Sequence, residues 1–153
     1  MAHLIDSDVF LAFTTYATIV VLKMMFMSPL TAYFRFATKS FANLEDVVGL
    51  AKTPEERKKM LQSNQDVERV RRCHQNDLEN IIPFVLIGLL YTLTGPDLSI
   101  ALLHFRAFVC SRLFHTVSYV LALPQPSRAL SWMVGMAVTI SMAYRTLVTV
   151  FYL

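Results

Sequence analysis

Four long apolar stretches constrain this chain more than any other feature of its sequence. They cover residues 9–36, 68–95, 98–122 and 127–152, and a helix needs roughly 20 predominantly apolar residues to cross about 30 Å of hydrocarbon. The second stretch reaches this length only if its helix continues N-terminally through Arg72, because its purely apolar part begins at Ile81. We therefore predict an all-α integral membrane protein, a single domain over residues 1–153 with four transmembrane helices.

The composition favours the same class of protein. Hydrophobic residues make up 55% of the 153 residues, charged residues make up only 16%, and the mean hydropathy is +0.48. Soluble domains average about 25% charged residues. The net charge is +3, but the basic segment between Lys39 and Arg72 also carries acidic residues. A nucleic-acid interface needs a basic excess on one face, so we expect no nucleic-acid partner.

The connections predict the topology. Tight turns at residues 95–97 and 123–127 favour antiparallel neighbours, and hence an up-down bundle. The polar loop at about residues 38–66 carries several lysines and arginines, so the positive-inside rule places it on the cytosolic side together with Arg128. The acidic residues near the opposite helix ends then lie on the other side of the membrane: Asp6, Asp8 and Asp97.

The two cysteines, Cys73 and Cys110, form no CxxC or Cys/His motif with metal-ligand spacing. We expect two free, buried thiols that pack as small hydrophobic side chains, with no bound metal and no disulfide.

Polar residues interrupt the second and third stretches at membrane depth, where charged side chains are normally turned inward and paired. On a helix with about 100° per residue, they form a stripe about 80° wide on each stretch. The stripe on the second stretch contains Arg69, Arg72, Asn76 and Glu79, and that on the third contains His104, Arg112, His115 and Tyr119. We predict that the two stripes face each other and line a site for an anionic ligand.

The charged residues of this region also have a structural interpretation. Arg69, Arg71 and Arg72 suit interfacial anchors, Glu79 suits a partner of Arg72, and Arg112 suits a side chain that snorkels toward the membrane surface.

Lys23 and Arg145 are lone charges in apolar stretches, and we expect each to be paired or to snorkel. Asp77 lies off the main stripe and is a candidate partner for one of them.

Several segments resemble the family of membrane-associated proteins in eicosanoid and glutathione metabolism. ERVRRCHQNDLEN at residues 68–80 looks like the family's signature, and FANLED at 41–46 is similar to its FANPED segment. RLFHTVSY at 112–119, LPQPSRALS at 123–131 and SMAYR at 141–145 follow in the family's order and spacing. Together these segments extend the resemblance over nearly the whole chain.

The resemblance implies a homotrimer that binds glutathione between subunits on the cytosolic side. It implies a glutathione transferase that conjugates the glutathione thiolate to lipophilic electrophiles from the bilayer, with glutathione-dependent reduction of lipid hydroperoxides as a second activity. The implied location is the endoplasmic reticulum membrane, with the mitochondrial outer membrane as a further one. The glutathione contacts carried over by position are Arg35, Arg71, Arg72, His74, Asn76, Glu79 and Tyr119, to which the two stripes add Arg69, Arg112 and His115.

Glutathione has two carboxylates, one ammonium and a thiol, and these groups suit the residues available. Arginines bind carboxylates through forked hydrogen bonds, and Glu79 suits the ammonium. The thiolate is the nucleophile, and a free thiol has a pKa of about 8.5, so a cation beside the sulfur is needed to lower it. Arg128, at the start of the fourth stretch, is the predicted catalytic residue.

One departure from the family pattern makes a transferase more favoured than a prostaglandin synthase. Family members that isomerise a prostaglandin endoperoxide carry a serine after the equivalent arginine, where this chain has Ala129. A glutathione-dependent prostaglandin E synthase is therefore the alternative to the transferase, and a non-catalytic membrane scaffold is the other.

Overall fold

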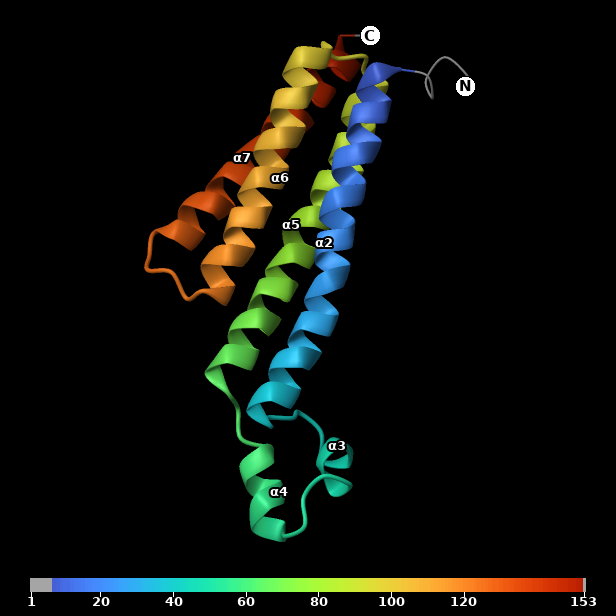
Figure 1. Ribbon diagram of the computed structural model, residues 1–153. Coiled ribbons are helices and arrows are strands. Elements are labelled where there is room, and N and C mark those ends of the chain that lie inside the picture. The colour runs from blue at the N-terminus through green and yellow to red at the C-terminus, as the bar shows by residue number, and fades with distance from the viewer. Residues whose placement is uncertain (1–6, 153) are drawn as a thin grey trace.

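The computed structural model describes residues 7–152, so Asp6 lies outside the described residues. All regular structure in this part of the chain is helical, which confirms the predicted all-α class (Figure 1). Four long helices pack side by side, and two short helices connect the first two of them along the chain. In chain order the helices are α2 (Asp8–Thr38), α3 (Leu44–Val48), α4 (Pro54–Met60), α5 (Gln65–Leu93), α6 (Leu98–Val120) and α7 (Ser127–Phe151).

The long helices alternate in direction along the chain. Figure 1 shows that α2 begins, α5 ends, α6 begins and α7 ends at one end of the bundle. At the other end α2 and α5 extend beyond the α6–α7 turn and carry α3 and α4 (Figure 1). The polar segment between α2 and α5 therefore lies at the end remote from the α5–α6 turn.

Three of the described helices, α2, α6 and α7, are long and apolar enough to cross a membrane. Helix α5 has 29 residues, which is more than the roughly 20 that a membrane-spanning helix needs. It differs from the others because its N-terminal half contains the charged residues between Asp66 and Glu79.

Side-chain caps define the start of the helices that position the site. At the start of α5, Asn64 Oδ1 accepts a hydrogen bond from the Asp66 backbone N–H at 2.8 Å. At the start of α6, Asp97 Oδ1 accepts bonds from the Ser99 hydroxyl and N–H and from the Ile100 N–H at 3.1 Å. The Ser99 hydroxyl and these N–H groups hold the pKa of the Asp97 carboxyl below its ordinary value, so this carboxylate is charged at neutral pH.

Two apolar clusters fill the bundle. The larger joins all four long helices near the α5–α6 turn, and in it the rings of Phe84 and Phe108 stack 3.7 Å apart. The smaller lies toward the other end and contains Met27, Val70 and Cys73. The buried polar residues described below lie between these clusters.

A close approach of α2 and α5 depends on Gly88. A Cβ at this position would lie 2.5 Å from Cε2 of Phe13, and that ring is itself packed against Phe105 with the ring centroids 5.6 Å apart. We predict that Gly88→Val lowers the free energy of unfolding by about 1–3 kcal/mol, because the ring has no room to move aside. Denaturant titration of the purified protein in detergent measures the change.

Gly49→Val is the matched control, because nothing lies within 4 Å of a Cβ at Gly49. We expect it to change the free energy by no more than about 0.5 kcal/mol. Equal effects of the two substitutions would contradict the close packing of α2 on α5.

Candidate functional site

A buried carboxylate joins three of the long helices. Asp77 on α5 is completely buried. It accepts a hydrogen bond from the Lys23 ammonium of α2 and another, of 2.7 Å, from Nη2 of Arg112 on α6. The Lys23 side chain is 9% exposed and that of Arg112 is fully buried. Of the two outcomes expected for Lys23, pairing or snorkelling, the structure shows pairing, and its partner is the candidate Asp77.

The core-facing side of α5 differs from the predicted one. The buried residues Val70, Cys73, Asp77 and Phe84 follow the helical period, so the buried stripe lies one position, or about 100°, from the predicted polar stripe. Both stripes contain polar residues, and the period alone does not indicate which one faces the core. The prediction that the polar stripe of α5 faces that of α6 is therefore wrong for its most exposed residues, Arg72 and Glu79.

Arg112 is the centre of the polar contacts on α6. Its Nη2 also donates to Oδ1 of Asn76 at 2.9 Å and lies 3.2 Å from Nδ1 of His115. Because guanidinium groups only donate, Nδ1 of His115 is the acceptor in this contact. The structural alternative that Arg112 snorkels is wrong, because its side chain is fully buried.

Arg112 retains hydrogen-bonding capacity. Its Nε and Nη1 are buried and have no hydrogen-bond partner within residues 7–152. One carboxylate, Asp77, faces two cations, so the cluster has a surplus of positive charge and of donors. An anionic ligand suits this surplus.

Tyr119 and Arg128 extend the cluster toward the α6–α7 turn. The ring centroids of His115 and Tyr119 are 5.0 Å apart, and Cζ of Arg128 lies 4.9 Å from the centroid of the Tyr119 ring. This is a cation–π geometry. Nε of Arg128 is buried, with no hydrogen-bond partner in the described part of the chain. The ring therefore holds the guanidinium while leaving donors for a ligand.

The remaining predicted residues do not join this cluster. They are exposed or half-buried on α2 and on the N-terminal half of α5: Arg35, Arg69, Arg71, Arg72, His74 and Glu79.

Several of these residues have neighbours on α5 itself. Arg69 pairs with Asp66, and Arg71 pairs with Glu68 at 2.9 Å. Glu79 accepts a hydrogen bond from Gln75 at 3.3 Å, and no ion pair joins it to Arg72 in the structure of residues 7–152.

A surface cavity of about 340 Å³ lies beside these residues. It is lined by Ser63, Gln65, Glu68, Arg69 and Arg72. Of the predicted residues, the chain thus brings together an inner group (Asn76, Arg112, His115, Tyr119 and Arg128) and separates it from an outer group (Arg35, Arg69, Arg71, Arg72, His74 and Glu79).

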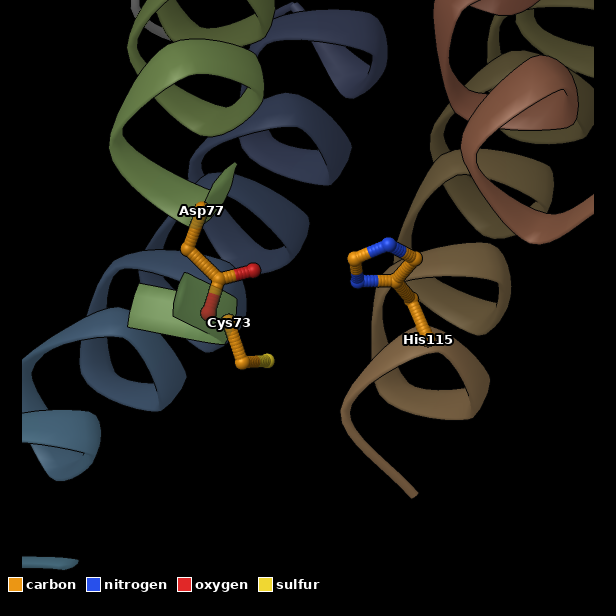
Figure 2. A group of neighbouring side chains, drawn as sticks. All are labelled: Cys73, Asp77 and His115. Carbon is orange, nitrogen blue, oxygen red and sulfur yellow. The ribbon is translucent and has the colours of Figure 1, made fainter. Parts of the chain in front are cut away.

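A thiol, a carboxylate and an imidazole converge within the cluster. Figure 2 shows Cys73 and Asp77 of α5 pointing toward His115 of α6, and their ligand-type atoms all lie within 4.8 Å of one another. Both carboxylate oxygens of Asp77 already accept hydrogen bonds from cations. The positive charge of those cations disfavours a metal ion at this position.

The cysteines are both free, as expected. Cys73 is buried, and its thiol lies 3.7 Å from the Thr116 hydroxyl. The expectation of two buried thiols is wrong for Cys110, which is exposed on α6.

Comparison with known proteins places these residues in a family. The family model described as MAPEG matches residues 13–148, and the chain belongs to this family. It is 56% identical over 153 residues to microsomal glutathione S-transferase 1 of Rattus norvegicus and of Homo sapiens, covering 100% of this chain and 98% of each relative. It is 37% identical over 143 residues to prostaglandin E synthase of Canis lupus familiaris, covering 92% of this chain and 88% of that protein.

Removing the central carboxylate tests the cluster. We predict that Asp77→Asn lowers the free energy of unfolding by about 3–5 kcal/mol, because two buried cations lose their counter-charge. Asp66→Asn, which breaks the partly exposed pair with Arg69, should change it by no more than about 1 kcal/mol. Unfolding midpoints in detergent measure both, and similar midpoints would show that Asp77 does not hold the bundle together.

Proposed function

We propose that this protein is a membrane-bound glutathione transferase that conjugates glutathione to lipophilic electrophiles. The observation that carries the proposal is the 55–56% identity over the whole chain to microsomal glutathione S-transferase 1 of several mammals. The surplus of buried guanidinium donors at Arg112 and Arg128 supports it, because glutathione is an anionic peptide. Lipophilic electrophiles would reach the site from the bilayer.

Helix α5 is proposed as the fourth membrane span, and the assembly as a homotrimer. The outer group of α5 and Arg35 would bind the carboxylates of glutathione, with Glu79 at its ammonium. These residues lie on a face of the subunit that the inner group does not share. A site between subunits would let the outer group of one chain meet Tyr119 and Arg128 of its neighbour, and would shield the outer charges from lipid.

Arg128 is the proposed catalytic residue. Its guanidinium rests on the Tyr119 ring, and a cation in such a position would stabilise the thiolate of bound glutathione. The thiolate would form a bond to the electrophilic carbon, and the leaving group would depart with the electron pair of its own bond.

We predict that Arg128→Ala lowers kcat by about 10²-fold or more, as when an electrostatic stabiliser is removed from an active site. The KM for glutathione should change much less, because the outer group would still bind the peptide. Arg128→Lys keeps the charge and should restore part of the rate. The assay is conjugation of 1-chloro-2,4-dinitrobenzene by the purified protein, and a raised KM for glutathione with kcat unchanged would assign Arg128 to binding alone.

Mixed assemblies test the site between subunits. Arg72→Ala and Arg128→Ala chains should each be nearly inactive alone. When they are co-expressed in equal amounts, about a quarter of the sites would combine an intact outer group with an intact Arg128 from the neighbouring chain, given random assembly. We predict that about this fraction of wild-type conjugation returns, and a mixture no more active than its components would place each site within one chain.

The alternatives are distinguished by substrate. Reduction of lipid hydroperoxides with glutathione would add a peroxidase activity. Turnover of a prostaglandin endoperoxide without conjugation would favour the synthase, to which the relatives at 35–38% identity give some support. Absence of glutathione binding would favour a scaffold. The transferase proposal fails if the protein binds glutathione but conjugates no electrophile and reduces no hydroperoxide.

The endoplasmic reticulum membrane is the proposed location, in keeping with the microsomal names of the relatives. The names of these relatives give no support to a location in the mitochondrial outer membrane.

A further inference from the structure

A second polar cavity lies where α5 turns into α6, facing the last part of α7. Its volume is about 540 Å³, which is within the range of about 300–1,000 Å³ for sites that bind small molecules. It shares no lining residue with the inner or the outer group of the glutathione site. Its lining residues are Tyr91, Thr94, Gly95, Pro96, Asp97, Ile100, Ser141, Tyr144, Arg145, Val148 and Thr149.

Arg145 gives this cavity a cation. No acidic side chain within residues 7–152 forms an ion pair with it, whereas Lys23, the other lone charge of the apolar stretches, is neutralised by Asp77. The planar fork of an arginine matches the oxygens of a phosphate. Arg145 is therefore suited to an anionic group that enters the cavity.

Tyr91 supplies a second donor. This residue is 1% exposed, and its hydroxyl is buried without a hydrogen-bond partner in the described chain. Two other lining hydroxyls are already engaged: that of Ser141 contacts His104 at 2.9 Å, and that of Thr149 donates to the Arg145 carbonyl at 3.0 Å. An unpaired buried hydroxyl is unfavourable, so Tyr91 also favours an acceptor in the cavity.

Asp97 adds a negative charge at the edge of the same cavity. Its Oδ1 accepts the three bonds that cap α6, and its exposed carboxylate leaves Oδ2 available to a ligand. A simple anion would be repelled by this group. A ligand with both an anionic and a cationic group matches Arg145 and Asp97 together.

We propose that this cavity binds the headgroup of a zwitterionic phospholipid, with the phosphate at Arg145 and Tyr91 and the ammonium at Asp97. The cavity opens among apolar side chains, including Ile100 and Val148, which are suited to contact the acyl chains. The α5–α6 turn and the last part of α7, which line the cavity, lie at the end of the bundle opposite α3 and α4 (Figure 1). The predicted topology assigns this end to the leaflet on the non-cytosolic side. This site does not depend on the proposed transferase activity.

Lipid binding to the purified full-length protein in detergent tests the proposal. The protein is stripped of lipid and titrated with dioleoylphosphatidylethanolamine, and bound lipid is counted by native mass spectrometry. We expect one tightly bound lipid per chain. Arg145→Gln should weaken it about tenfold or more, and Tyr91→Phe, which removes only the hydroxyl, about threefold or more.

Arg106→Gln is the matched control. Arg106 is an exposed arginine of α6 that donates to the Tyr16 hydroxyl at 2.9 Å and does not line the cavity. The substitution Arg106→Gln should leave lipid binding unchanged. Equal loss in Arg106→Gln and Arg145→Gln, or no loss in either, would overturn the site in favour of lipid held by the general surface.

The ammonium part of the proposal has its own test. Wild-type protein should prefer phosphatidylethanolamine to phosphatidylglycerol, and Asp97→Asn should abolish that preference while retaining the helix cap, since asparagine caps as well as aspartate. Equal binding of the two lipids by the wild type would overturn the assignment of Asp97. Displacement of the bound lipid by the same concentration of inorganic phosphate would overturn the lipid site. It would indicate a site that binds simple anions.

Discussion

The structure depends on one buried carboxylate shared by two cations. Asp77 connects α2 through Lys23 and α6 through Arg112, and it lies on α5 between the two apolar clusters of the bundle. Removing charges from water is strongly unfavourable unless they are paired and hydrogen-bonded. The triad meets this requirement for three helices at once, and it thereby fixes their rotation and their depth relative to one another.

The same triad determines what remains for a ligand. Two cations share one anion, so Arg112 keeps buried donors that no side chain of the described chain uses. Tyr119 supports Arg128 through its ring face, which leaves the guanidinium edge open. The inner group is thus brought together within one chain. The outer group lies on an exposed face of α5, and its proposed role requires a neighbouring subunit.

The sequence predicted the all-helical class and the membrane character, because hydropathy and helix length suffice for both. It also indicated Asp77 as a candidate partner for Lys23 or Arg145, and the structure pairs it with Lys23. It did not indicate which face of α5 is buried, since a shift of one residue rotates the stripe by about 100° and both stripes carry polar residues. The exposure of Cys110 and the Tyr91–Arg145 cavity depend on tertiary packing, and no local pattern reveals them.

The triad also has a consequence for biosynthesis. Lys23 precedes Asp77 by 54 residues in the chain, and a ribosome that adds about 5–20 residues per second needs roughly 3–11 s to make that segment. During this interval the first helix carries a cation whose partner does not yet exist, and hydrocarbon is a poor environment for it. Lys23 can be neutralised by Asp77 only after α5 has been made, so the stability of the first helix in the membrane depends on a later part of the chain.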